Sequence, residues 1–341
     1  MDISMFETRT MLQALEQLHP PKTFLLDTFF PTVETSDSEY VDIDIYKGKR
    51  RLAPFVNPAR QGKVVEALGY TTRSYKPPYI KMKMPTTAAE IMSRTMGNHI
   101  YQDGQSPSER AATRAMRDMQ ELREMIVRRE EWMAAQALDG GQIAVEGEGV
   151  SDVLDFQMED ANKIVLSGTS QWDGADADIG ADIRNARRVV GKQSGIVPTD
   201  FVLGEQAYDA LIKNPALLKQ LDNRRVNTGQ IDLAAYSAMG ASYVGNLFGA
   251  DLWTYDEWYT GDDGEEKPMV PVNKVFAGSR QARTARHYGA IKDLSAIASV
   301  PYYPKSWEEE DPSVRWMMLQ SAPLVVPHQI DAFATITVVS E

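Results

Sequence analysis

The chain of 341 residues contains no cysteine. That absence excludes disulfide frameworks, thiolate metal sites and cysteine nucleophiles. The chain has only four histidines, and none of them pairs with another at the spacing of metal ligands: His19, His99, His287 and His328. Because domains usually contain about 150 residues, a chain of this length suggests two domains. It can bury a large core, so its stability requires neither disulfides nor a metal.

Long apolar runs are also absent. The uncharged run at residues 316–330 is interrupted by Pro323 and Pro327 and is shorter than the ~20 residues that span a bilayer. Asp2 and Glu7 stand where a signal peptide carries lysine or arginine, so we expect neither secretion nor a membrane location. With 43% hydrophobic and 25% charged residues, the composition is that of a globular protein.

The motifs of nucleotide and metal sites are incomplete. Gly191-Lys192 lacks the earlier glycine and the following Ser or Thr of a phosphate-binding loop. Four acids resemble half of a calcium loop without its closing glutamate: Asp173, Asp176, Asp178 and Asp182. We interpret them as acids just before a helix and in its first turn, where the helix dipole favours negative charge. We therefore expect no enzyme activity, no cofactor and no metal.

The charge lies in blocks along the chain. The net charge is −12, yet residues 1–46 carry nine acids and two bases, and residues 145–182 carry ten acids and one base. Between them, residues 47–94 carry eleven bases and two acids. We call residues 47–94 the basic segment. Blocks of opposite sign in one chain indicate a partner of complementary charge, which is another part of the chain, a neighbouring copy or an external polyion.

Local patterns predict the main elements. Val41, Ile43 and Ile45 alternate with acids, and Ile80, Met82 and Met84 alternate with lysines, which predicts two strands of one long ribbon, each with one buried face. A ribbon has little core of its own, so we expect it to lie on another surface. The sequence 106-SPSE-109 is a capping box at the start of a long helix, which 139-DGG-141 ends. Residues 173–281 read as a mixed α/β region.

Three functions are consistent with these residues. The enzyme hypothesis lacks candidates for a catalytic site. A nucleic-acid-binding protein could use the basic segment with its interleaved tyrosines, although the net negative charge of the chain opposes binding to a polyanion. A self-assembling subunit would place the basic segment on an acidic surface of a neighbouring copy, in a head-to-tail contact that closes into rings or shells. The predicted contact residues are Lys47, Lys49, Arg50, Arg51, Lys81 and Lys83.

Several stretches, in this order and spacing, resemble a known family, the major capsid protein of tailed double-stranded-DNA phages, and within it the lambda-like group. They are 24-FLLDTFFP-31, 53-APFVNP-58, 79-YIKM-82, 285-ARHYGAIKD-293, 302-YYPKSW-307 and 319-LQSAPL-324. The resemblance runs through essentially the whole chain. It implies the α+β fold of tailed-phage capsids, called the Hong Kong 97-type.

The resemblance also implies how the chain is divided. On the family's pattern, residues 1–38 are an N-terminal arm and residues 39–93 an extended loop over a neighbouring subunit. Residues 94–175 form the peripheral domain with its spine helix at 106–138, residues 176–292 the axial domain, and residues 293–341 the return to the peripheral domain with the C-terminal strands.

The implied function is structural. Copies assemble as hexamers and pentamers, with scaffold and portal proteins, into an icosahedral procapsid that expands as DNA is packaged. A decoration protein is a further possible partner in the lambda-like group, and the packaged DNA is bound without sequence specificity. The implied location is the virion capsid, assembled in the cytoplasm of the bacterial host. The alternative within the same fold is an encapsulin-type compartment that encloses protein cargo.

Overall fold

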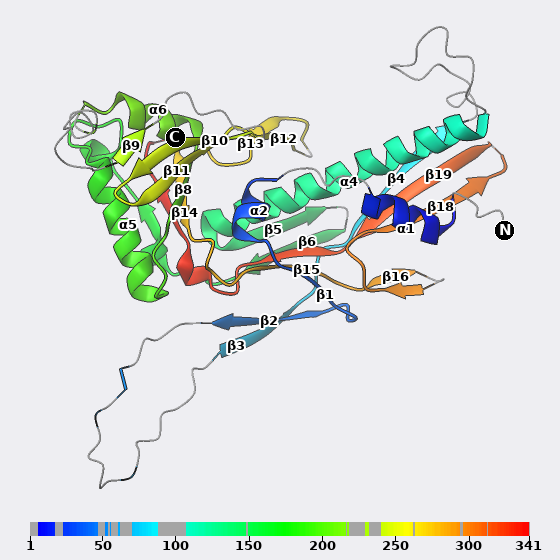
Figure 1. Ribbon diagram of the computed structural model, residues 1–341, viewed down its shortest axis with the longest axis horizontal. Coiled ribbons are helices and arrows are strands. Elements are labelled where there is room, and N and C mark those ends of the chain that lie inside the picture. Colours follow the sequence, from blue (N-terminus) through cyan, green and yellow to red (C-terminus); the bar gives the residue numbers. More distant parts are fainter. Residues whose placement is uncertain are drawn as a thin grey trace.

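In the computed structural model, residues 6–17, 23–46, 52–53, 55, 61, 70–87, 107–147, 149–215, 217, 229–231, 240–261, 263–293, 296–311 and 313–340 are described. Figure 1 shows an elongated α+β body. One long helix and a three-stranded sheet form one end of it, and a larger sheet with two helices forms the other.

The long helix is α4, Pro107–Gly140. Its 34 residues give a rod of about 51 Å. The prediction of a long helix at 106–138 is confirmed to within a turn, while Ser106 of the predicted capping box lies outside the described residues. Gly141 ends the helix with φ +69°, a conformation that side chains rarely adopt. A Cβ there would also stand 2.5 Å from the Cβ of Met158, so only glycine fits at this turn.

A three-stranded antiparallel sheet lies beside the first half of α4, in the order β18 (Tyr303–Glu309), β19 (Val314–Ser321) and β4 (Ile80–Thr87). Helix α1 (Thr8–Gln17) packs beside them. The apolar positions of these elements form one core cluster, as the amphipathic periods predict. Its buried members are Met11, Leu15, Ala115, Met119, Leu122, Ile126, Met317 and Leu319.

Substituting aspartate for Met119 should abolish soluble folding. The Met119 side chain is only 2% exposed, and a carboxylate there would be buried without a partner, which costs several kcal/mol. Met116 on the same helix is 39% exposed, so Met116→Asp is the matched control and should fold. Circular dichroism and the soluble fraction after expression measure both. A folded Met119→Asp subunit would contradict the packing of this face.

The structure differs from the prediction in how the basic segment pairs. Strand β2 (Val41–Tyr46) forms its ribbon with β3 (Tyr70–Tyr75), whereas β4 pairs with β19 along its whole length. The alternation of β4 was predicted correctly, because its lysines are exposed and its apolar residues pack on the cluster of α4. The prediction that β4 belongs to the ribbon was wrong. The distant β19 offers β4 both hydrogen bonds and a buried face.

A seven-stranded mixed sheet forms the other end. Its order is β7 (Lys163–Val165), β21 (Ala334–Thr337), β14 (Lys274–Gly278), β8 (Asp200–Leu203), β11 (Ala250–Tyr255), β10 (Ala241–Leu247) and β9 (Gly229–Ile231). Helices α5 (Ile179–Gln193) and α6 (Glu205–Lys213) cover one face, where Phe201 and Leu203 pack with them. Val202 points to the other face, so the central strand β8 is buried on both sides.

The third cluster joins the two ends. It contains the last turns of α4, the short helix α2 (Leu25–Phe29) and strand β20 (Pro323–Val326). Strand β20 pairs with β15 (Ala285–Tyr288), which pairs with β1 (Val33–Thr35). The remaining elements are three hairpins and three short 3₁₀ turns: β5 (Gln142–Gly147) with β6 (Val150–Asp155), β12 (Trp258–Thr260) with β13 (Glu266–Pro268), β16 (Ile291–Asp293) with β17 (Ala296–Ala298), η1 (Asp160–Asn162), η2 (Gly168–Ser170) and η3 (Ile330–Ala332).

Candidate assembly surfaces

The described ranges contain no metal centre. No group of three or more His, Asp or Glu side chains there could hold a metal ion. Among the same residues, no helix is both long enough and apolar enough for a bilayer crossing. Two glutamates, Glu130 and Glu131, are buried in the core, where they bind tyrosine hydroxyls and backbone N–H groups.

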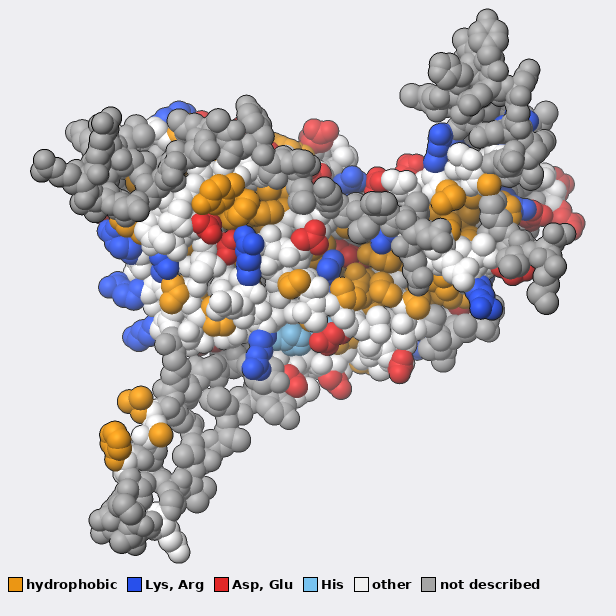
Figure 2. Space-filling model, viewed as in Figure 1, with side chains coloured by type: hydrophobic (Ala, Val, Ile, Leu, Met, Phe, Trp, Pro, Cys, Tyr) orange, Lys and Arg blue, Asp and Glu red, His pale blue; other side chains and the backbone are white. Residues whose placement is uncertain are grey.

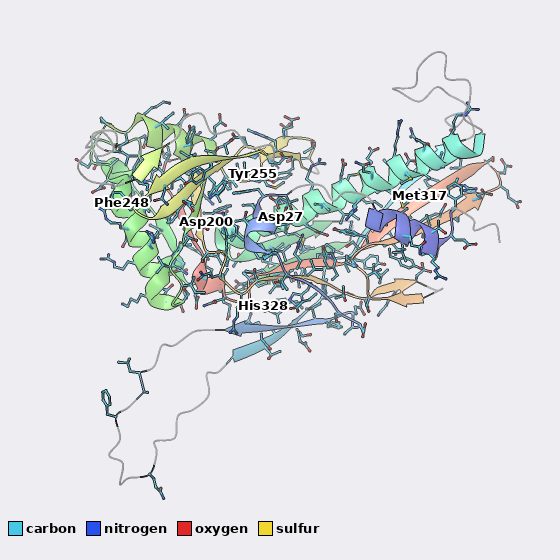
Figure 3. All side chains as sticks on the ribbon, viewed as in Figure 1. Asp27, Asp200, Phe248, Tyr255, Met317 and His328 are labelled. Atoms are coloured by element: carbon cyan, nitrogen blue, oxygen red, sulfur yellow. The ribbon has the colours of Figure 1, made fainter. Side chains whose placement is uncertain are left out.

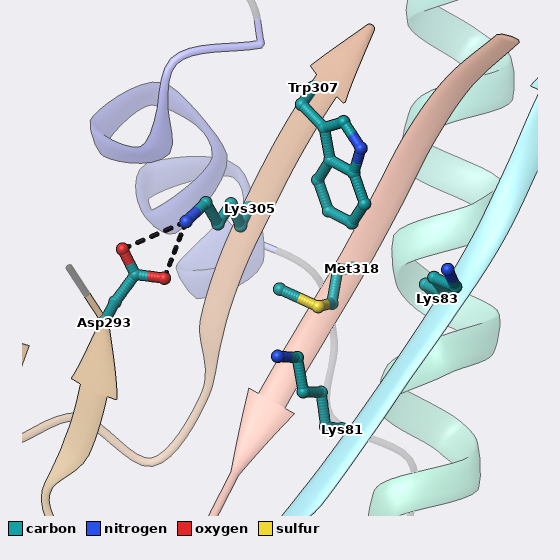
Figure 4. A pocket seen from close by; sticks show the side chains of 6 residues that line it. All are labelled: Lys81, Lys83, Asp293, Lys305, Trp307 and Met318. Carbon is teal, nitrogen blue, oxygen red and sulfur yellow. Dashed lines mark hydrogen bonds and ion pairs between the residues drawn. The ribbon is translucent and has the colours of Figure 1, made fainter. Parts of the chain in front are cut away.

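Two of the predicted contact residues lie on one exposed face. Lys81 and Lys83 are exposed and point to the side of β4 that faces away from α4. They border an open pocket of about 540 Å³ on the outer side of the three-stranded sheet (Figure 4). We call it the lysine pocket. Its lining residues are Lys81, Lys83, Asp293, Lys305, Trp307 and Met318.

The lysine pocket keeps an uncompensated positive charge. Lys305 is paired, because its Nζ lies 3.0 and 2.7 Å from the two carboxylate oxygens of Asp293. Lys83 lies 4.3 Å from the ring centre of Trp316, a cation–π contact that orients the ammonium without neutralising it. Within the described ranges, no carboxylate pairs with Lys81 or Lys83. Trp307, 36% exposed, adds an aromatic surface, so the pocket suits an acidic segment with apolar side chains.

The other four predicted contact residues, Lys47, Lys49, Arg50 and Arg51, lie outside the described residues. The base of the ribbon that leads to them is described and is held firmly. Val41 and Ile43 of β2 are buried in the main core, and the hydroxyl of Tyr75 on β3 donates to the carbonyl of Asp155 at 2.8 Å. The ribbon therefore starts from a fixed position on its own subunit.

A histidine pair lies at the same base. His328 Nε2 is 3.0 Å from His287 Nε2, and His328 Nδ1 is 3.1 Å from the carbonyl oxygen of Asp44 on β2 (Figure 3). Glu34 lies 3.5 Å from the other nitrogen of His287. Burial lowers the pKa of His287, the neighbouring His328 lowers it further, and Glu34 opposes both. His287 is thus neutral near neutral pH, and the contact of His328 with the Asp44 carbonyl connects strand β2 to the body of the subunit.

Two consecutive buried glutamates, which are not among the residues predicted from the sequence, hold α4 to its surroundings. The carboxylate of Glu131 accepts hydrogen bonds from three successive backbone N–H groups at the start of α2, those of Phe24, Leu25 and Leu26, at 2.7–3.0 Å. It also accepts one from the hydroxyl of Tyr255 on β11 at 2.9 Å (Figure 3). Burial raises the pKa of Glu131, and these hydrogen bonds oppose the rise.

Glu130 faces the opposite neighbours. It accepts hydrogen bonds from Tyr288 on β15 at 3.0 Å and from Tyr302 at 3.2 Å. Burial raises the pKa of Glu130 to about 7, against the lowering effect of both tyrosines and of Arg286 and Arg123. The helical period could have revealed both acids. Each lies four residues after a buried apolar residue of α4, Ile126 or Val127, and so falls on the buried side.

Known proteins similar to this chain agree with the architecture. A family model described as phage major capsid protein E matches residues 7–338. The chain is 27% identical over 342 residues to the major capsid protein of Escherichia phage lambda, covering 98% of this chain and 99% of that protein. It is 27% identical over 345 residues to the major capsid protein of Enterobacteria phage P21, covering 98% and 100%. A crystal structure of a prophage capsid protein from E. coli CFT073 is similar in fold, with a TM-score of 0.73 and 21% identity over 97% of this chain and 99% of that one.

Proposed function

The chain belongs to the phage major capsid protein E family, and from this premise we propose how its copies overlap in the shell. It is a structural subunit of the phage head, in the lambda-like group, and not an enzyme. It has the α+β fold of Hong Kong 97-type capsid proteins and works in the virion capsid in many copies. An encapsulin-type compartment and a nucleic-acid-binding protein are less well supported, because the relatives that match 98% of this chain are head proteins.

The proposed division of labour follows the predicted one. The arm (1–38) and the peripheral parts (94–175 and 293–341) build the wall, the axial domain (176–292) surrounds the local symmetry axis, and the loop (39–93) lies over a neighbouring subunit. The chain order supports this division. Strands β7 and β21, from the peripheral ranges, hydrogen-bond into the sheet that contains the axial strands, so the two domains share one sheet.

We place the contact between copies at the lysine pocket. The observation that carries this proposal is the pair of exposed lysines, Lys81 and Lys83, which have no carboxylate partner in the described part of the chain. The acidic segments 1–46 and 145–182 of a neighbouring copy have the complementary charge. Lys47, Lys49, Arg50 and Arg51 belong to the same proposal, as the part of the basic segment that reaches the neighbour.

The double variant Lys81→Glu/Lys83→Glu should lower the yield of assembled particles by about tenfold or more, because like charges then face each other across the contact. Both side chains are exposed, so the isolated subunit should keep its circular dichroism spectrum. The matched control is Lys81→Arg/Lys83→Arg, which keeps the charge and should assemble. Sedimentation and electron microscopy count the particles, and a normal yield from the glutamate variant would contradict the proposal.

Assembly takes place in the host cytoplasm as hexamers and pentamers around a scaffold, with a portal at one vertex, and a decoration protein is a further candidate partner. The packaged DNA is enclosed without sequence-specific contacts. The net charge of −12 supports this last point, since an acidic wall does not retain the polyanion that moves past it.

A further inference from the structure

Helix α5 carries a straight line of exposed positive charge. Ile183, Ala186 and Val190 on one side of the helix are buried against the large sheet. Arg184, Arg188 and Lys192 are exposed and recur every four residues, so they lie in one line of about 12 Å. We call them the basic stripe. Figure 2 shows blue side chains along the edge of the molecule that α5 forms in Figure 1.

The basic stripe has no internal counter-charge. In the described ranges, no carboxylate forms an ion pair with Arg184, Arg188 or Lys192. The guanidinium of Arg184 lies 4.5 Å from the ring centre of Phe248, and that of Arg188 donates to Asn185 at 2.9 Å. Such contacts hold the side chains in place but leave their charge available to a partner.

The loop before α5 carries exposed charge of the opposite sign, on Asp173, Asp176 and Asp178. We call residues 173–178 the acidic loop. Asp178 has a structural role, because its side chain caps the helix by accepting from the N–H of Ala181 at 2.9 Å. Asp173 and Asp176 precede the helix, so capping does not account for them. No cation in the described part of the chain pairs with either of them.

The two charged sets form no ion pair with each other in the part of the subunit that the structure describes. Arg188 lies nine residues into α5, about 14 Å along the helix from the end that the acidic loop joins. Between copies related by rotation, however, a positive surface on one meets a negative surface on the next, and the contact repeats until the ring closes.

We propose that the basic stripe of one subunit binds the acidic loop of the adjacent copy within the same ring of subunits. The inference rests on the self-assembly proposed above and adds the surfaces that close a ring. DNA is the competing occupant of a basic stripe. A second copy fits better, because charges of both signs adjoin on α5, whereas a polyanion would be repelled by the acidic loop.

Cross-linking tests the contact directly, since the chain has no cysteine of its own. The variant Ala175→Cys/Arg188→Cys carries one thiol in the acidic loop and one in the basic stripe. Particles treated with a short bismaleimide should give a ladder of linked subunits in denaturing gels. Each single-cysteine variant, the matched control, can give dimers at most. Assembled particles of the double variant that show no ladder would overturn the proposal.

Charge reversal tests the proposed ring contact independently. Arg184→Glu/Arg188→Glu should reduce assembled particles by about tenfold, while Arg184→Lys/Arg188→Lys should not. Adding Asp173→Lys/Asp176→Lys to the glutamate variant should restore assembly. Normal assembly of the glutamate variant would overturn the proposed ring contact but not the proposed function. If those normally assembled particles also contained less DNA, the basic stripe would be assigned to nucleic-acid binding instead. Failure of the unaltered chain to assemble would instead count against the function proposed above.

Discussion

Replacing Glu131 by alanine should abolish soluble folding of the subunit. Three backbone N–H groups and one tyrosine hydroxyl would lose their acceptor in the core. Each unsatisfied buried donor costs about 1–3 kcal/mol, against a total stability of about 5–15 kcal/mol. Glu131 is 2% exposed, so water does not readily take its place. The soluble fraction and urea unfolding measure the effect.

The matched control for this variant is Glu121→Ala, at an exposed position on the same helix. It should change the free energy of unfolding by no more than about 0.5 kcal/mol. Glu131→Gln should fall between the two. Its single carbonyl oxygen can keep the contacts of one carboxylate oxygen, but its amide group then faces the N–H of Leu26. If Glu131→Ala unfolded at the same urea concentration as the unaltered chain, the carboxylate would not be what holds α2 to α4.

Replacing Glu130 by glutamine should remove a pH dependence of stability. In the unfolded chain this carboxyl group ionises near its ordinary pKa of 4.5, whereas in the folded chain burial raises the pKa to about 7. Between these values the folded state keeps a proton that the unfolded state loses. This part of the stability is therefore complete below pH 4.5 and is lost as the pH rises through about 7.

The expected loss of stability follows from the size of the pKa shift of Glu130. At 1.36 kcal/mol per pKa unit, the unaltered chain should lose roughly 3 kcal/mol relative to Glu130→Gln between about pH 5 and about pH 8. Chemical unfolding of unassembled subunits at several pH values measures the difference, and every other titrating group cancels in it. Glu121→Gln is the control and should show no such trend. Parallel stability curves for Glu130→Gln and the unaltered chain would show that Glu130 ionises normally in the core.

Local conformation was predictable where the chemistry is local. The ends of α4 follow from a proline at its start and glycines at its end, and the two-residue period of β4 follows from its alternating lysines and apolar residues. The family was predictable from short stretches in a fixed order. The partner of β4 was not, because β19 lies more than 200 residues away in the sequence and any strand with an apolar face would have fitted the same pattern.

The contact residues, too, could be predicted only in part from the sequence. Lys81 and Lys83 were identified from the charge of the basic segment, but Trp307 and Asp293, which complete the pocket, could not be connected with them from sequence spacing. The helical period places Glu130 and Glu131 on the buried side of α4, but the groups that bind their carboxylates come from distant segments and could not be predicted.

The sequence by itself determined the spine helix, the alternation of the strands, the blocks of opposite charge and the membership of a capsid family. Only the tertiary structure decided which strands pair, which groups bind the buried carboxylates and which charges remain without a partner on the described surface. The physical reason is that helix ends and strand faces depend on neighbours a few residues away. Burial and pairing depend on the sum of many weak contacts between distant segments, and no single stretch of the chain contains that sum.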